Sequence, residues 1–183
     1  MIIDITMELS ERTPVYASDP HVQLRNHTTL EEDGYAVSSM AMGSHSGTHV
    51  DAPCHMVPGG GSVVDIPLDT LVGKCLVVDV REMRIPRTTK RVLIKGNTGR
   101  DCTLNVRQAE ALLKMGVELI GTDGLSIGDD EVHKILLEAQ CAVLECLDLG
   151  RANPGGYFLC AMPLKVDLDG APVRACLLPL TEE

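Results

Sequence analysis

One short segment of the chain concentrates side chains that bind metal ions. Its sequence from residue 45 to residue 55 is His-Ser-Gly-Thr-His-Val-Asp-Ala-Pro-Cys-His. It holds three imidazoles and one carboxylate, at His45, His49, Asp51 and His55, in a chain that has only 6 histidines. Imidazole nitrogen and carboxylate oxygen are the usual ligands of catalytic zinc, manganese and iron. The segment therefore predicts a metal site of the kind that supports hydrolysis.

The spacing of these four residues favours an extended chain over a helix. All four occupy odd positions, so in a strand their side chains would share one face. On a helix each residue advances by about 100°, and Asp51 would point away from His45 and His49. Gly47 and Pro53 also disfavour a helix interior, for entropic and steric reasons. We therefore expect an extended segment.

A straight strand would hold the first two histidines far apart. His45 and His49 would be separated by about 13 Å, which is the limit of what two imidazoles can bridge to one ion with bonds of about 2 Å. Gly47 is the residue that can bend the backbone between them. We expect either a bend that folds His45 back towards Asp51, or two ions bridged by Asp51. His55 has three interpretations: a ligand, a proton-transfer group, or a residue that orients a ligand.

A second pair of candidate ligands comes later in the chain. His133 falls on a predicted helix and Glu145 on the strand that follows, and both reach the same level if the strand runs back beside the helix. Glu145 interrupts an apolar run, and a buried carboxylate there needs a cation or hydrogen-bond partners. Taken alone, His133 could be a solvated helix residue and Glu145 a surface residue of an edge strand. Added to the first cluster, they supply enough donors for two adjacent ions.

Composition limits the classes of function and the compartment. The chain has 183 residues, 44% of them hydrophobic, which suits one globular domain over 1–183. The formal net charge of -10 argues against nucleic acid and anionic membrane surfaces as partners. The sequence lacks a signal-peptide pattern and an apolar run long enough for a membrane span. The 7 cysteines include no Cys-x-x-Cys pair, which indicates reduced thiols and a cytoplasmic protein. Cys54, inside the motif, could be sensitive to oxidation or, as its even position suggests, could face away from the metal.

The apolar pattern predicts a mixed α and β domain with an irregular, barrel-like sheet and two main helices. Strands are expected at 2–5, 35–42, 75–80, 92–95, 117–122, 142–149 and 172–178. One helix is expected from about 105 to 115, after Thr103 or Asn105 as N-cap, with its apolar side at Ala109, Leu112 and Leu113. The other begins near Asp129 or Asp130, with its apolar face at Val132, Ile135, Leu136 and Ala139. Loops are expected at 59–62 and 153–156.

The segment from His45 to His55 resembles the His-x-Gly-Thr-His-x-Asp-x-Pro-x-His signature of the cyclase family, which includes bacterial kynurenine formamidase and isatin hydrolase. Every fixed position of the signature matches. The resemblance extends over nearly the whole chain, through an early turn at 13–19, the spacing of His133 and Glu145, and closing segments at 147–149 and 163–165.

The resemblance implies a swivelling β/β/α-type fold, a homo-oligomer, and one or two divalent ions, zinc or manganese, in each subunit. The ligands that it implies are His45, His49, Asp51, His133 and Glu145. Among them, Asp51 and Glu145 could each bridge two ions. His55 would be the catalytic acid and base.

The implied activity is hydrolysis of a C–N amide bond in a small N-formyl, N-acyl or cyclic amide. A bound ion would lower the pKa of water from about 15.7 towards about 7 and polarise the substrate carbonyl. His55 would take a proton from that water and return it to the leaving nitrogen, since imidazole titrates near neutral pH. Two alternatives remain: a non-catalytic protein that binds a metabolite through the metal, and a metal that only stabilises the fold.

The chain departs from the family where substrate would bind. Formamidases of the family recognise an aromatic ring and often have Phe after the last histidine of the signature, where this chain has Met56. It contains no Trp, 1 Phe and 3 Tyr. Tyr16, in the early turn, is the candidate substrate-binding residue, with Tyr35 or another subunit as further sources of an aromatic side chain. The expected substrate is a small amide or lactam.

Overall fold

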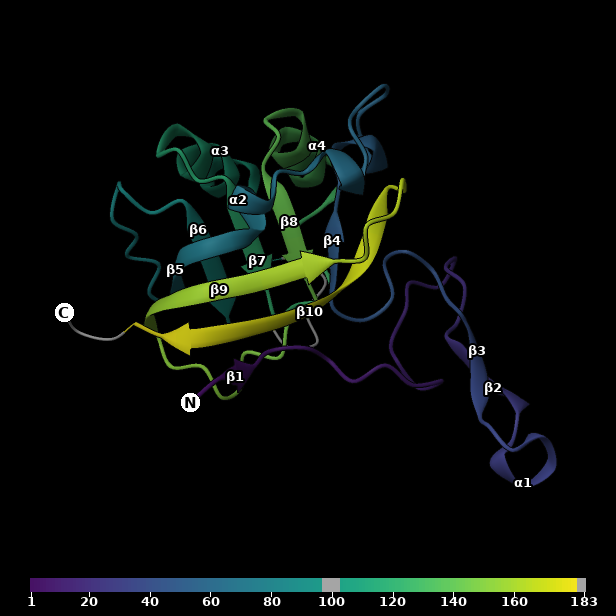
Figure 1. Ribbon diagram of the computed structural model, residues 1–183. Helices are drawn as coiled ribbons and strands as arrows, with labels where there is room; N and C mark the ends of the chain where they lie inside the picture. The colour runs from purple at the N-terminus through teal and green to yellow at the C-terminus, as the bar shows by residue number, and fades with distance from the viewer. Residues whose placement is uncertain (97–102, 181–183) are drawn as a thin grey trace.

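The computed structural model describes residues 1–96 and 103–180 (Figure 1). Its strands are β1 (Ile3–Asp4), β2 (Gln23–Thr28), β3 (Val37–Ala41), β4 (His49–Asp51), β5 (Val72–Asp79), β6 (Arg91–Lys95), β7 (Leu119–Thr122), β8 (Ala142–Glu145), β9 (Gly155–Pro163) and β10 (Gly170–Pro179). Its α-helices are α1 (Leu30–Asp33), α2 (Leu68–Leu71), α3 (Val106–Lys114) and α4 (Asp130–Glu138). Two 3₁₀ turns are η1 (Pro53–His55) and η2 (Val63–Asp65). Cys102, one of the cysteines considered above, lies outside the described residues.

Seven of these strands close into a barrel. Their order is β10-β4-β8-β7-β6-β5-β9, and β9 pairs back onto β10. The pairs from β5 to β8 are parallel, whereas β4, β9 and β10 pair antiparallel with their neighbours. β1 extends the sheet beyond β10. Closure removes most of the sheet edges that would otherwise be exposed. The expected α+β class with a barrel-like mixed sheet is confirmed.

Alternation along the strands divides the apolar residues into two cores. On β6, Leu93 belongs to the cluster inside the barrel, whereas Val92 and Ile94 belong to the cluster beneath α3 and α4. On β8, Leu144 points into the barrel and Val143 towards the helices. Both helices therefore cover the outer face of the parallel strands, as Figure 1 shows.

Both main helices form where the sequence predicts them. Asn105 caps α3 by accepting a hydrogen bond from the Gln108 amide, and Asp129 caps α4 by accepting one from the Val132 amide. One detail of the expected apolar face is wrong. Ala139 is exposed because α4 ends at Glu138, and Leu137 is buried instead.

Two strands were not expected. β9 begins at Gly155, so the loop expected at 153–156 is wrong in its second half, where Gly155 pairs with Val77 on β5. Glycine and proline suggested a turn, but pairing with the long strands β5 and β10 decides the conformation there. β2 is almost entirely exposed, so it has no apolar alternation by which to recognise it.

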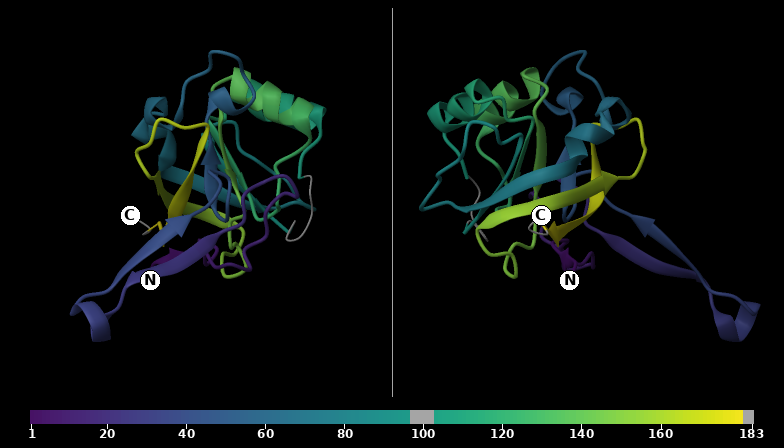
Figure 2. Two further views of the ribbon diagram at one scale, coloured as in Figure 1. Left: turned by 90° about the vertical axis from the view of Figure 1, so that its right-hand side faces the viewer. Right: turned by 60° about the vertical axis from the view of Figure 1, so that its left-hand side comes forward.

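β2, α1 and β3 form an arm that projects from the barrel. Figure 2 shows the same projection in two further views. The arm is a two-stranded antiparallel sheet in which every residue of β3 is exposed. Several large apolar side chains are exposed on it: Leu24, Leu30, Tyr35, Val37 and Met40. No helix in the described ranges 1–96 and 103–180 is both long and apolar enough to cross a membrane.

Candidate metal centre

Strand β4 presents two ligand candidates on the outer face of the barrel. Val50, between them, is in the barrel core, so His49 and Asp51 point the other way. In the pairing with β8, His49 lies directly opposite Glu145. Directly opposite residues in an antiparallel pair bring their Cβ atoms to about 5 Å, which places both side chains at one site.

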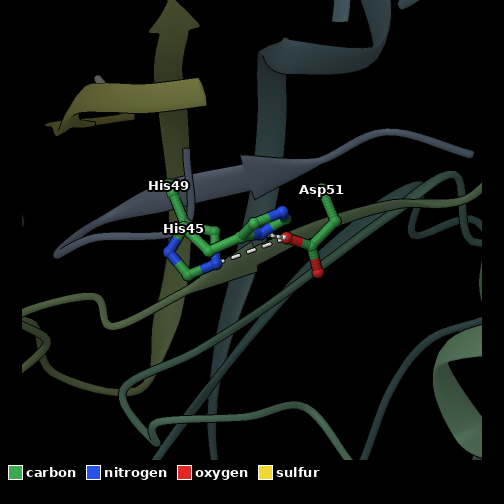
Figure 3. A group of neighbouring side chains, drawn as sticks. All are labelled: His45, His49 and Asp51. Carbon is green, nitrogen blue, oxygen red and sulfur yellow. Dashed lines mark hydrogen bonds and ion pairs between the residues drawn. The ribbon is translucent and has the colours of Figure 1, made fainter. Parts of the chain in front are cut away.

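The expected bend at Gly47 is present and returns His45 to β4. Gly47 has a φ of +66°, and a Cβ at this position would lie 2.6 Å from the Leu9 Cδ2 atom. His45 Nδ1 then lies 2.8 Å from Asp51 Oδ1, and the rings of His45 and His49 have centroids 5.0 Å apart. Figure 3 shows these three side chains converging.

The expectation that the whole segment is extended is wrong outside β4. After Asp51 the chain turns into η1, because Pro53 suits the first position of a helical turn. This turn places the His55 ring 4.1 Å from the ring of His45, between centroids. Cys54 lies on this turn and packs against the barrel core, so the turn, and not the alternation of a strand, determines where it points.

The second half of the site joins α4 to the end of β8. His133 Nε2 lies 3.0 Å from Glu145 Oε1 and 3.6 Å from Asp51 Oδ2. Glu145 Oε2 lies 3.5 Å from His49 Nε2, and Glu145 Oε1 also accepts a hydrogen bond from the Ile127 amide at 2.6 Å. The surface interpretations of His133 and Glu145 are wrong, since they are only 6% and 4% exposed.

Two of the histidines have a fixed tautomer. His49 Nδ1 lies 2.7 Å from the Gly47 carbonyl, and His133 Nδ1 lies 3.2 Å from the Asp129 carbonyl. A carbonyl oxygen can only accept, so both Nδ1 atoms carry the proton. The lone pair of each neutral ring is therefore on Nε2, which faces the carboxylates. Metal-binding histidines are held by such a bond from the outer nitrogen.

Charges at the site perturb one another strongly. Burial alone would lower the pKa of His133, but its interactions with the Asp51 and Glu145 carboxylates raise the pKa to about 10. The pKa of His49 is raised well above its ordinary value by the same two carboxylates, again against burial. Burial opposes ionisation of Asp51, yet the neighbouring histidines hold its pKa well below the ordinary value.

The donor set fits divalent metal. Asp51 Oδ2 is one of three buried polar side-chain atoms in the described ranges without a hydrogen-bond partner, although Asp51 is only 1% exposed. A carboxylate oxygen so deeply buried requires a partner, and a cation supplies one. Possible ligand atoms that lie within 4.8 Å of one another form three groups in the described ranges: His45, His49 and Asp51; His45, His55 and Asp169; and Asp51, His133 and Glu145. Asp51 belongs to two of these groups, so its carboxylate is placed where it could bridge two ions.

Asp169 is a member of the site that the sequence did not reveal. It immediately precedes β10, and its Oδ2 atom lies 2.9 Å from His45 Nε2 and 3.5 Å from His55 Nδ1. Asp169 with Gly170 has the composition of an ordinary turn, so the sequence alone offers no signal. Only the pairing of Gly170 with Asp51 brings it to the motif.

An open cavity of about 630 Å³ lies over the cluster. His45, His49, His55, His133, Glu145 and Asp169 all line it. Tyr16 and Met56 form part of its wall, which places Tyr16 where a substrate contact was expected. Tyr35 lies on the arm, outside the residues that line this cavity. The volume suits a small molecule.

The barrel carries a buried cluster of histidines and carboxylates beneath an open cavity, an arrangement that suits a metal-dependent hydrolase. The family model for Cyclase matches residues 3–98. The chain is 36% identical to the kynurenine formamidase of Salinibacter ruber, over 96% of each sequence, and 32% identical to that of Sphingopyxis alaskensis, over 96% of this chain and 97% of the relative. The chain therefore belongs to the cyclase family.

Solved structures agree with this assignment. A "predicted metal-dependent hydrolase" from Bacillus stearothermophilus superposes with a TM-score of 0.79 at 29% identity, covering 97% of both chains. Isatin hydrolase A from Ralstonia solanacearum shares the fold, with a TM-score of 0.81 at 21% identity over 98% of this chain and 92% of that one. The expected family, fold class and enzyme class, a metal-dependent amidohydrolase, are confirmed.

Proposed function

We propose that this protein hydrolyses the C–N amide bond of a small N-formyl, N-acyl or cyclic amide, with a divalent ion at the Asp51 cluster and His55 as general acid and base. The observation that carries the proposal is the shared carboxylate. Asp51 faces two ligand groups with its two oxygen atoms, and the other members of these groups, His45, His49, His133 and Glu145, line a cavity open to a small molecule.

The residues divide into two sets of ligands. His45, His49 and Asp51 would hold one ion, and Asp51, His133 and Glu145 a second, with zinc and manganese both suited to these donors. Two donors that each bond one ion at about 2 Å lie about 3 to 3.5 Å apart, close to the separations described above. When bound, the ion would polarise the substrate carbonyl and lower the pKa of water so that hydroxide forms at neutral pH.

His55 suits proton transfer better than ligation. It lines the cavity with 26% of its side chain exposed, whereas the candidate ligands His49 and Asp51 are nearly inaccessible. It belongs to neither group that includes Asp51. From the cavity wall, His55 can accept a proton from water as the nucleophile forms and donate it to the leaving nitrogen.

The relatives guide the class of substrate. Kynurenine formamidases match this chain over nearly their whole length, which supports an N-formyl amide. Tyr16, 51% exposed on the cavity wall, is the aromatic side chain available to stack on an aromatic substrate. We propose that it does so.

Turnover of a panel tests the proposal. Purified protein loaded with zinc or manganese is assayed against N-formylkynurenine, simple N-acyl amides, lactams and isatin. We expect hydrolysis of at least one class, lost with the metal in the variants His49→Ala and Asp51→Ala. Tight binding of a panel member without turnover would instead support a metal-dependent binding protein. If metal-loaded protein neither binds nor hydrolyses any amide of the panel, the result would favour a metal that only stabilises the fold.

We also propose a cytoplasmic homo-oligomer that contacts its partner through the arm. A lone two-stranded hairpin is marginally stable in water, and this one exposes Leu24, Tyr35 and Met40. A second copy would cover these side chains. The six cysteines of the described segments are all free thiols, which suits a reducing compartment.

A further inference from the structure

In each candidate histidine ligand, the ring nitrogen that faces away from the proposed metal has a hydrogen-bond partner, and the partner of His45 differs from the others. The outer nitrogens of His49 and His133 bond to backbone carbonyls, which are fixed by the fold. In His45, Nδ1 faces Asp51 and the outer nitrogen, Nε2, faces the side chain of Asp169 at 2.9 Å. His45 therefore depends on a charged side chain for its orientation.

The same carboxylate reaches His55. Asp169 Oδ2 lies 3.5 Å from His55 Nδ1, so one oxygen atom lies between the outer nitrogen of a candidate ligand and the ring of the candidate acid and base. The two rings are themselves in contact, with centroids 4.1 Å apart. A single group is thus placed to fix the position of one ring relative to the other.

Backbone and side-chain hydrogen bonds position Asp169 at this site. Its carbonyl accepts a hydrogen bond from the Ala52 amide at 2.8 Å, and Ser44 Oγ donates to Oδ1 at 3.1 Å. The next residue, Gly170, pairs with Asp51 across β10 and β4. A Cβ at position 170 would lie 2.6 Å from His45 Cε1, so glycine is required for the ring to lie against the strand.

We infer that Asp169 is a positioning residue that orients His45 for metal binding and His55 for proton transfer. The inference rests on the proposed function, since it gives Asp169 a role only in a metal-dependent hydrolase. When His45 holds a divalent ion through its inner nitrogen, Asp169 would accept a hydrogen bond from the outer N–H, as carboxylates do when they orient metal-binding imidazoles.

The test measures metal binding, which depends on His45, separately from catalysis, which depends on His55. The variants Asp169→Ala and Asp169→Asn are compared with Asp167→Ala, which removes an exposed carboxylate two positions earlier in the same loop. Zinc affinity is measured by competition with a chromophoric chelator. The number of zinc ions bound per chain is measured at saturation, and kcat and KM are measured at saturating zinc.

We expect Asp169→Ala to weaken zinc binding by about 10 to 100-fold with unchanged stoichiometry, and to lower kcat at saturating zinc by at least about tenfold. Asp169→Asn, which keeps the shape of the side chain and an acceptor oxygen, should lose less zinc affinity and less kcat than Asp169→Ala. Asp167→Ala should change neither quantity. Thermal midpoints near that of the parent protein would show that the variants fold, and Asp169→Asn supplies the comparison if Asp169→Ala does not fold.

Three results would overturn the inference. Loss of one zinc equivalent at saturation would make Asp169 a ligand, a higher KM alone would make it a substrate contact, and parental affinity with parental kcat would leave it no role. Failure of the proposed function is a separate result, because the parent protein would then bind no zinc or hydrolyse no amide.

Discussion

Asp51 is the residue on which both halves of the site depend. One oxygen faces His45 and His49, and the other faces His133, at distances between 2.8 and 3.6 Å. The spacing of the motif identified His45 and His49 as its neighbours, but that Oδ2 lacks a hydrogen bond was visible only in the folded chain. Asp51 points out of the barrel because Val50, beside it on β4, points in. It is nevertheless buried, with His133 of α4 packed close to it.

The role of His55 can be separated experimentally from that of the candidate ligands. We expect His55→Ala to keep its bound metal and to lower kcat by about 10² to 10⁴-fold, the contribution of a general acid and base. Metal content by elemental analysis, with kcat on the hydrolysed amide, measures both. Full activity in this variant would remove His55 from the mechanism, and loss of metal would make it a ligand.

The raised histidine pKa values give a dependence on pH. The pKa of His133 rises from 6.5 to about 10 on folding, so its contribution to stability is complete below pH 6.5 and is lost as the pH rises towards 10. Metal must displace protons from these rings, so metal binding strengthens over the same range.

Thermal midpoints between pH 6.5 and 9.5 check this pair of trends. In chelator, the midpoint should fall as pH rises, whereas the increase produced by added zinc should grow. Parallel pH curves with and without zinc would show that zinc does not compete for the protons of these histidines.

At the scale of elements, the bend before β4 decides whether His45 reaches the site. Gly47→Ala places a Cβ against Leu9 in a left-handed conformation, and we expect a loss of about 1 to 3 kcal/mol with weaker metal binding. Gly59→Ala is the matched control, because its φ of +72° is similar but nothing lies within 4 Å of the added atom.

The two variants are compared by chemical unfolding and by zinc affinity. Gly59→Ala should lose about 1 kcal/mol and keep parental affinity. Equal effects of the two substitutions on both measurements would mean that the bend at Gly47 does not position His45.

How much the sequence predicts differs between elements. α3, α4 and most strands were predictable because caps and apolar spacing are local signals. The bend at Gly47 was predictable because His45 and His49 in a straight strand would lie too far apart to bind one ion comfortably. β9 and Asp169 were not predictable, since pairing partners distant in the chain decide both. The extended form of the whole motif was wrong because Pro53 begins a turn that the odd register could not reveal.

At the scale of the whole molecule, the arm is the feature that the barrel does not explain. Leu24 and Met40 lie directly opposite one another on β2 and β3 and are both exposed. If the arm contacts a second copy, the double variant Leu24→Ser, Met40→Ser should shift the protein towards monomer. Arg25→Ser, one position along β2, is the control and should leave the assembly unchanged.

Sedimentation equilibrium at micromolar concentrations measures this shift. A parent protein that is monomeric, or a double variant with parental mass, would contradict assembly through the arm. Truncating these side chains should leave the distant barrel folded, which far-UV circular dichroism checks.

Whether the Asp51 cluster supports metal-dependent hydrolysis is tested by titrating metal into chelator-treated protein and measuring amide hydrolysis at each step. We expect negligible turnover without metal, and activity that rises with added zinc or manganese and saturates at one or two equivalents per chain. The variant Asp51→Asn should not recover activity when metal is added. Turnover that survives complete metal removal, or metal-saturated protein that hydrolyses no formamide, N-acyl amide or lactam, would contradict this prediction.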